Sequence, residues 1–194
     1  MNVFDVGIIG GGVIGQGIAY ELSKAGLKTA VFESGEIGGK ATSAAAGMLG
    51  AHSENEKRDI FFELCLESRN LYPSLANELL EQSGVDIELV QEGMYRLAFT
   101  EEEARYLQSL AEDEDELEWQ SRENVLANEP HISKDIAGAL WLKHDGQVKG
   151  SSVCCAYAKG ARKYGASIFE QCPVFDVIKE GKAYKLVTSQ GVFI

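Results

Sequence analysis

Three glycines and one glutamate near the N-terminus have the types and spacing of a nucleotide-binding site. Gly10, Gly12 and Gly15 form a G-x-G-x-x-G pattern directly after an apolar run. In such a turn the first glycine permits the tight bend, the second leaves room for a diphosphate, and the third lets the helix approach the strand. The diphosphate would lie at the helix N-terminus, where N–H groups and the helix dipole favour an anion.

Glu33 supplies the acidic residue that such a site needs for the ribose. It stands 21 positions after Gly12, at the end of the next apolar run. A carboxylate there accepts hydrogen bonds from the ribose hydroxyls, and its charge disfavours the 2′-phosphate of NADP. A Gly-rich turn followed by an unrelated surface glutamate is the alternative, and the strand–turn–helix context argues against it.

A second segment of small residues bears on which dinucleotide is bound. Residues 34–43 are rich in Gly, Ala, Ser and Thr, and could surround the pyrophosphate and ribityl chain of an extended cofactor. NAD-dependent dehydrogenases have no general need for such a segment, so it favours the ADP part of FAD. Simple helix capping by Thr42 and Ser43 remains the alternative from the residues alone.

The elements that position these residues can be predicted from apolar periodicity. Residues 3–9 indicate a buried parallel strand and residues 27–32 a second one. Between them apolar residues recur every four positions, at Ile14, Ile18 and Leu22, which indicates a helix. Gly26 is placed to end this helix. Together these segments predict a βαβ unit.

The rest of the chain alternates between helical and strand patterns. Residues 36–50 predict a loop with a short helix close to a ligand. Residues 61–83 predict either one kinked helix or two successive helices, because Pro73 lies inside an apolar stripe of Phe61, Leu64, Leu71, Leu75 and Leu79. Thr100 and Glu103 match a helix capping box. Further helices are expected at 121–129 and 153–164, and strands at 93–99, 137–142, 167–169, 174–178 and 184–187.

Composition limits the function classes. The 194 residues carry a formal net charge of −12, which disfavours general binding to nucleic acid or to anionic membranes. Four cysteines without a C-x-x-C pattern predict reduced thiols, and three scattered histidines give no metal-ligand spacing, so we predict no metal site. The acidic stretch 112–118 predicts a solvated turn. The absence of a signal-like N-terminus predicts a cytoplasmic location.

Several stretches resemble the FAD-dependent D-amino acid oxidase-like family, and within it the bacterial glycine oxidases of thiamine biosynthesis. They are Glu33-Ser34-Gly35, Gly38-Gly39, the run TSAAAGMLGAH at 42–52, SGVDI at 83–87, Gly93-Met94, Leu97-Ala98-Phe99 and the region 165–174. The run at 42–52 is more specific than the glycine pattern. The resemblance covers essentially the whole chain.

The resemblance implies a set of FAD-binding residues, with no catalytic residue among them. Besides Gly10, Gly12 and Gly15, it assigns the Gly-rich turn (Val13, Ile14), the adenosine ribose (Glu33, Ser34), the pyrophosphate side (Ala41, Thr42, Ser43), the flavin side (Ala46, Gly47, Met48) and the adenine (Val174). One departure is Lys149-Gly150, where the family often has an acidic residue and a proline. We predict a structural role for His52. For Arg96 we predict a place on the exposed face of a strand and no binding of the substrate carboxylate.

The resemblance also implies the activity and the fold class. The expected reaction is oxidative deamination of glycine or a similar small amine to an imine, with release of hydrogen peroxide from molecular oxygen. Sarcosine or a D-amino acid is the alternative substrate, and a truncated, non-catalytic FAD-binding fragment is the alternative function. Family members are longer, so we expect the substrate-binding residues beyond Ile194, an inactive isolated chain, and a homo-oligomer at full length.

The expected fold is α/β, a Rossmann-like FAD-binding domain with an inserted mixed α/β portion of a substrate domain, truncated at the C-terminus. We assign residues 1–84 to the FAD-binding part, residues 85–148 to the substrate domain, and residues 149–194 to the return into the FAD-binding domain.

Overall fold

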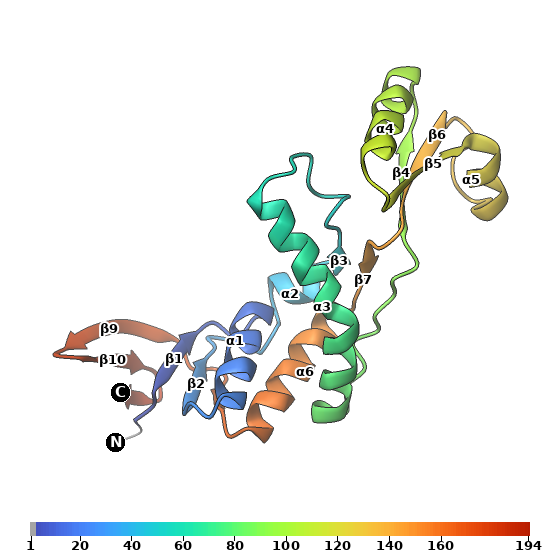
Figure 1. Cartoon of the computed structure of the whole chain (residues 1–194). Helices are drawn as coiled ribbons and strands as arrows, with labels where there is room; N and C mark the ends of the chain where they lie inside the picture. The colour runs from blue at the N-terminus through green and yellow to red at the C-terminus, as the bar shows by residue number, and fades with distance from the viewer. Residues whose placement is uncertain (1–2) are drawn as a thin grey trace. The chain divides into compact units, whose positions relative to one another are not determined.

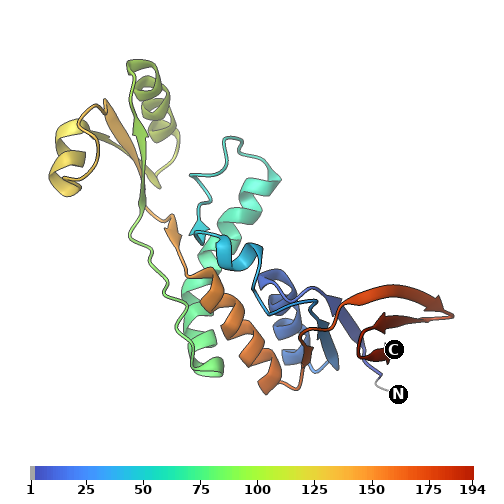
Figure 2. The same cartoon turned by 180° about the vertical axis from the view of Figure 1, so that it is seen from behind.

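The structure, a computed structural model, describes residues 3–194, apart from the side chain of Asp113. It divides into two compact units (Figures 1 and 2). The first unit contains the chain up to Gly47, Pro73–Leu89 and Val148–Ile194, and the second contains Met48–Tyr72 and Val90–Gln147. The mixed α/β class is as predicted. Residues 48–72 group with the second unit, whereas the sequence assigned them to the FAD-binding part.

A parallel sheet forms the centre of the first unit. Strand β1 (Val6–Ile9) leads into helix α1 (Val13–Lys24), which returns to β2 (Thr29–Phe32), and β8 (Ser167–Phe169) completes the order β1-β2-β8. All pairs are parallel, so the predicted βαβ unit is confirmed. Every residue of β2 is buried, but β1 is an edge strand with Ile9 57% exposed. The prediction of a buried strand was therefore wrong for β1.

Helix α1 buries a different face from the one its apolar stripe predicts. Its buried residues are Gln16, Ala19, Tyr20 and Ser23, whereas Ile14 is 77% exposed and Ile18 is 46% exposed. The reason is the partner helix α6 (Gly150–Lys163), which lies beside α1 (Figure 1). A Cβ on Gly160 would lie 2.5 Å from the ring of Tyr20, so this glycine lets the two helices approach.

An antiparallel sheet packs against the parallel one through aromatic side chains. It has the order β11-β10-β9, formed by β9 (Val174–Glu180), β10 (Ala183–Thr188) and β11 (Gly191–Phe193). Phe32 stacks on Phe169 at 5.3 Å between centroids, and Phe193 meets Phe32 edge-on at 4.8 Å. The sequence predicted no strand after residue 187, so β11, which is only three residues long, was missed.

Helix α3 (Ile60–Ser83) is one continuous helix with Pro73 inside it, so the alternative of two successive helices was wrong. Its predicted apolar stripe is largely exposed, because Phe61, Leu64 and Leu71 are each about 60% accessible and only Leu79 is fully buried. The short helix predicted in 36–50 is α2 (Ala41–Ala44).

The second unit is built on an antiparallel sheet of order β4-β6-β5. These strands are β4 (Met94–Ala98), β5 (Leu117–Ser121) and β6 (Gly138–Leu142), and β3 (Met48–Leu49) pairs separately with β7 (Gly146–Gln147). Helix α4 (Glu101–Asp113) begins at the predicted capping box of Thr100 and Glu103, which is confirmed. Helix α5 (Arg122–Asn128) begins after Ser121, whose hydroxyl accepts a hydrogen bond from Asn124 N–H.

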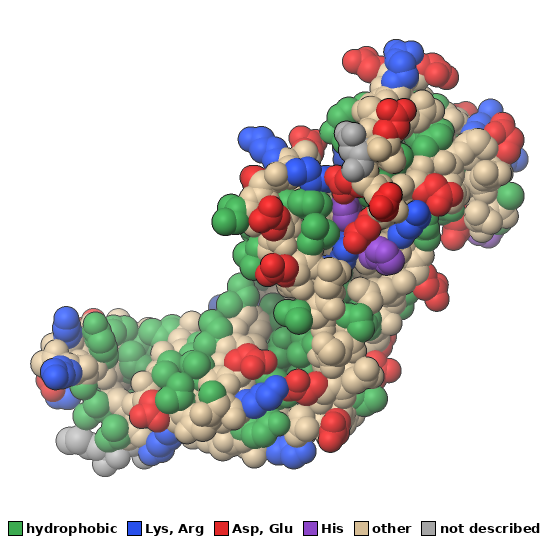
Figure 3. Space-filling model, viewed as in Figure 1, with side chains coloured by type: hydrophobic (Ala, Val, Ile, Leu, Met, Phe, Trp, Pro, Cys, Tyr) green, Lys and Arg blue, Asp and Glu red, His purple; other side chains and the backbone are tan. Residues whose placement is uncertain are grey.

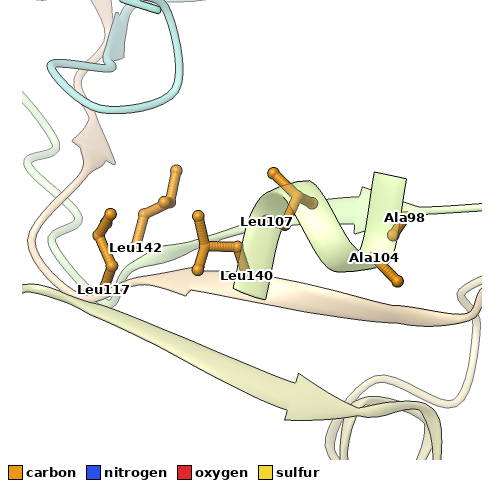
Figure 4. Packing of buried hydrophobic residues seen from close by; sticks show 6 residues of the cluster. All are labelled: Ala98, Ala104, Leu107, Leu117, Leu140 and Leu142. Atoms are coloured by element: carbon orange, nitrogen blue, oxygen red, sulfur yellow. The ribbon is translucent and has the colours of Figure 1, made fainter. Parts of the chain in front are cut away.

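The core of the second unit lies between this sheet and α4. Its buried members come from all three strands and from the helix (Figure 4): Ala98, Ala104, Leu107, Leu117, Leu140 and Leu142. The partly buried side chains of Met94 and Trp119 pack against them. Leu140 lies on the central strand, so it is supported from both neighbouring strands.

The surface carries both signs of charge. On the face seen in Figure 3, acidic and basic side chains are interspersed instead of gathering into one patch of either sign. Among the described residues, none of the helices has the length and apolar character needed to cross a membrane.

Truncation of Leu140 tests the core of the second unit. We expect Leu140→Ala to lower the free energy of unfolding of the second unit by about 2–5 kcal/mol, because truncating a fully buried leucine leaves a cavity. The two tryptophans, Trp119 and Trp141, both lie on this sheet, so tryptophan fluorescence during urea unfolding reports on this unit. Leu64→Ala, at a site 59% exposed, is the matched control and should change stability by under about 0.5 kcal/mol. Equal losses in both variants would contradict the prediction.

Candidate functional site

The Gly-rich turn between β1 and α1 has the geometry that its glycines predict. Gly10 has a φ of +107°, in the left-handed region where glycine carries no Cβ penalty. A Cβ on Gly15 would lie 2.0 Å from the carbonyl oxygen of Gly10, so the helix can begin here only without a side chain at this position. A Cβ on Gly12 would meet only the hydroxyl of Thr42, at 3.3 Å. Gly12 thus borders open space, as a diphosphate site requires.

The carboxylate of Glu33 lies beside this turn and is only 8% exposed. It accepts hydrogen bonds from Gly11 N–H at 2.7 Å, Gly35 N–H at 2.8 Å and the hydroxyl of Ser34 at 3.1 Å. Burial alone would raise the pKa of Glu33, but these hydrogen bonds outweigh it and hold the pKa below its usual range. An ionised, fixed carboxylate at the end of β2 has the form needed to accept ribose hydroxyls.

Gly11, the glycine between two motif positions, is the junction that the sequence analysis missed. Its N–H donates to Glu33, and its carbonyl oxygen accepts from Gly38 N–H at 3.0 Å and from the Cys154 thiol at 3.6 Å. A Cβ on Gly11 would lie 2.8 Å from the Cβ of Glu33. The signal in the sequence was that Gly11 makes a run of three consecutive glycines, whereas the G-x-G-x-x-G pattern has no requirement for glycine at this middle position.

Thr42 bridges the second small-residue segment to the Gly-rich turn. Its hydroxyl oxygen accepts a hydrogen bond from Val13 N–H, at the first position of α1, at 3.1 Å. The N-cap of its own helix α2 is Lys40, which makes no side-chain cap bond. Thr42 therefore caps α1 instead of α2, while the hydroxyl of Ser43 donates to the Lys40 carbonyl at 2.8 Å.

The remaining residues that the resemblance assigns to FAD binding lie in several elements around the Gly-rich turn and beyond it. Ala41 is in α2, and Ala46 and Gly47 follow it. Gly47 has a φ of +80°, and a Cβ there would lie 1.9 Å from the Val148 carbonyl oxygen. Met48 opens β3 and belongs to the second unit. Val174 opens β9, after a segment whose Cys172 N–H donates to the Glu33 carbonyl at 2.8 Å.

At the start of α6 the departure from the family pattern is accommodated locally. Lys149 is the N-cap and pairs with Glu88 at 2.9 Å. A Cβ on Gly150 would lie 3.2 Å from the Thr42 carbonyl oxygen, so a residue with a side chain would press against this segment.

All four cysteines are free thiols.

A buried ionic cluster in the second unit contains His52, for which we predicted a structural role. Arg69, 2% exposed, donates to Asp145 at 3.0 Å and to His52 Nδ1 at 3.0 Å. Because arginine can only donate, Nδ1 is the acceptor and Nε2–H donates to Glu114 at 2.8 Å. Arg96 lies half-buried on β4, with its guanidinium 5.9 Å from the centroid of the Tyr106 ring.

The same cluster corrects the prediction that residues 112–118 are merely a solvated turn. Glu114 binds His52, and Glu116 accepts from Arg69 at 2.7 Å. Two acids of this stretch thus hold a buried arginine and histidine. Among the described residues there is no group of acidic, histidine or cysteine side chains arranged to hold a metal ion.

Comparison with known families gives the class of protein. The model of the FAD dependent oxidoreductase family, DAO, matches residues 5–193, and the chain belongs to this family. The prediction of FAD as the cofactor is confirmed at this level.

Individual relatives are more specific. The chain is 47% identical over 188 residues to the glycine oxidase of Bacillus subtilis, covering 97% of this chain and 51% of that protein. The crystal structure of glycine oxidase from Geobacillus kaustophilus superposes with a TM-score of 0.93 at 40% identity, covering 100% of this chain and 53% of that one. A "Bifunctional protein ThiO/ThiG" of a Synechocystis strain is 31% identical over 192 residues, covering 97% of this chain and 28% of that protein. The chain spans about half the length of the glycine oxidases that it matches.

The residues of the first unit fit the ADP part of FAD. Gly12 leaves space beside the first turn of α1, and the N–H groups of that turn can face a diphosphate. Glu33 keeps capacity for a ribose hydroxyl at Oε2, which accepts one hydrogen bond, whereas Oε1 already accepts two.

Replacement of Gly12 tests the diphosphate position. We expect Gly12→Val to abolish binding of ADP, because a branched side chain would occupy the space beside the first turn of α1. The fold should survive, since an added Cβ meets only one hydroxyl. ADP binding can be followed by NMR titration, and helix content by circular dichroism. Ala25→Val, at an exposed position beyond the other end of α1 with a φ of −75°, close to the −73° of Gly12, is the control for adding a branched side chain. Unchanged ADP affinity in Gly12→Val would show that this turn does not hold the phosphates.

Asp145 gives a prediction for acid stability. Burial alone would raise its pKa, but hydrogen bonds from the backbone N–H groups of His52 and Ser53 and from Arg69 lower the pKa to about 2. A depressed folded-state pKa stabilises the fold above the unfolded pKa of about 3.9, and this stabilisation disappears as the pH falls toward 2. We expect the second unit to lose about 2–3 kcal/mol in this way.

The comparison variant is Asp145→Asn. It should be less stable at pH 7, because Arg69 stays buried with Glu116 as its remaining anionic partner, and its stability should fall less between pH 4 and pH 2. Urea midpoints from tryptophan fluorescence at each pH provide the measurement. Parallel pH profiles for the two proteins would rule out Asp145 as the source of the acid sensitivity.

Proposed function

We propose that the whole protein is an FAD-dependent oxidase of glycine or a similar small amino acid or amine. The observation that carries the proposal is the 40–47% identity to glycine oxidases over nearly the entire chain. The Gly-rich turn and the fixed carboxylate of Glu33 support it independently, because both are parts of a dinucleotide site. Sarcosine or a D-amino acid is the alternative substrate.

In this proposal the chain's own residues bind and orient the cofactor. The first turn of α1, with Gly10, Gly12, Val13, Ile14 and Gly15, would receive the diphosphate. Glu33 and Ser34 would hold the adenosine ribose. The remaining positions follow from the family resemblance: Ala41, Thr42 and Ser43 at the pyrophosphate, Ala46, Gly47 and Met48 toward the flavin, and Val174 at the adenine.

Bound FAD would supply the redox chemistry, a two-electron, two-proton oxidation of the amine to an imine, with molecular oxygen as the final acceptor that becomes hydrogen peroxide. The residues described here would supply position and electrostatics. The lowered pKa of Glu33 keeps it anionic at neutral pH, so it serves as an acceptor for hydroxyl groups and not as a proton donor. No side chain of this segment is assigned as a general base.

The biological setting is part of the same proposal. We infer a role in the biosynthesis of the thiamine thiazole, a cytoplasmic location, and a homo-oligomeric whole protein, each on the strength of the family resemblance. The division into FAD-binding residues 1–84 and 149–194 and substrate-domain residues 85–148 is proposed likewise. For the 194 residues alone, the alternative is a non-catalytic FAD-binding segment.

A chimera tests the proposed activity. Residues 1–194 would be joined to the remaining half of the Bacillus subtilis glycine oxidase, and peroxide would be measured with glycine, sarcosine and D-alanine. We expect bound FAD by absorbance, turnover with glycine as the preferred substrate, and no turnover by the 194 residues alone. The flavin spectrum shows whether the chimera is folded. A flavin-loaded chimera that is inactive toward all three amines would contradict the proposed activity. Robust turnover by the 194-residue chain would contradict the separate expectation that the substrate-binding residues lie beyond Ile194.

A further inference from the structure

Cys154 on α6 lies at the junction of the two segments that form the nucleotide site. Its side chain is 1% exposed, and its thiol donates to the carbonyl oxygen of Gly11 at 3.6 Å, within the range for a sulfur donor. A Cβ on Gly38 would lie 3.2 Å from the Cys154 sulfur. One side chain thus contacts the Gly-rich turn and the second loop at once.

Gly38 connects Gly11 to the second loop, residues 34–43, through its own backbone hydrogen bonds. Its φ of +67° requires glycine, and its N–H donates to the same Gly11 oxygen at 3.0 Å. Its own carbonyl accepts from Ser43 N–H at 3.0 Å, and a Cβ on it would lie 3.7 Å from the Thr42 methyl group. The backbone from Gly38 to Thr42 is therefore fixed relative to the Gly11 peptide group, with the Cys154 sulfur packed against both.

The thiol is held in its donor form. Burial, together with the charges of Cys155 and Glu33, raises the pKa of Cys154 to about 11, so the S–H group persists at neutral pH. The Gly11 carbonyl then has two donors, the Gly38 N–H and the thiol, which matches its two lone pairs. On the opposite side of the same residue, the Gly11 N–H is bound by Glu33.

We propose that Cys154 is a positioning residue for the nucleotide, acting through the backbone of Gly11. It fixes the orientation of Gly11, and with it the Gly11 N–H that holds Glu33, and it sets the separation between the Gly-rich turn and the segment that carries Thr42. The inference rests on the proposed nucleotide site and adds a residue of α6 that lies some 140 positions from the glycine motif.

Two substitutions of nearly equal size separate hydrogen bonding from packing. Cys154→Ser keeps a donor and Cys154→Ala removes it, in the same 194-residue chain. Two quantities are measured by NMR: the affinity for ADP, and the hydrogen-exchange rate of the Gly38 amide. Cys155→Ala, at the exposed neighbouring position, is the control.

We expect the serine variant and the Cys155 control to keep ADP affinity within about twofold of the unsubstituted chain. The alanine variant should lose about three- to tenfold in affinity, the effect of one hydrogen bond, and its Gly38 amide should exchange faster by a similar factor. Equal behaviour of the serine and alanine variants would overturn the positioning role, whether both match the unsubstituted chain or both fall below it. Failure of the unsubstituted chain to bind ADP would contradict the nucleotide site itself, and the inference with it.

Discussion

The backbone of Gly11 joins the Gly-rich turn to Glu33, to the second loop and to α6. Its N–H is 2.7 Å from the Glu33 carboxylate, and its carbonyl receives Gly38 N–H and the Cys154 thiol. The constraint behind this arrangement is steric, because a side chain at residue 11 would collide with Glu33. With the side chain absent, the N–H and the carbonyl of Gly11 can reach three other segments, and the backbone of this one residue positions all three.

Hydrogen bonds within the chain position the residues of the candidate site without a ligand. Thr42 already satisfies the N–H of Val13, and Glu33 already accepts bonds at both carboxylate oxygens. Buried polar groups without hydrogen-bond partners would destabilise the fold. Here other residues of the same chain provide those partners. A nucleotide then adds contacts to a formed cradle, which lowers the ordering cost of binding.

In the second unit the corresponding constraint is a buried charge. Arg69 and Asp145 are 2% and 0% exposed, and each would be costly to bury without the other. Backbone N–H groups of His52 and Ser53 satisfy the remaining capacity of Asp145, and Glu116 satisfies that of Arg69. The cluster therefore joins a loop, a helix and two turns that are far apart in sequence, within one unit.

Local patterns were sufficient to predict elements whose signals depend on neighbouring residues. The βαβ unit, the capping box of Thr100 and the glycine-terminated helices are all present, because turn and cap geometry depends on a few consecutive residues. The FAD assignment also came from sequence, through the glycine spacing and the specific run at 42–52. Boundaries were less certain, and the three-residue strand β11 gave no periodic signal.

What the tertiary structure alone decided is which faces are buried and which distant residues meet. The apolar stripe of α1 pointed to Ile14 and Ile18, yet the face packed on α6 contains Tyr20, because Gly160 on that helix admits the ring. Contacts between segments separated by tens of residues determine the roles of Gly11, Cys154, Glu114 and Glu116. The sequence determined the turn that can hold a diphosphate, since that requirement is local. Its surroundings were set by long-range packing, for which a single sequence carries no periodic signal.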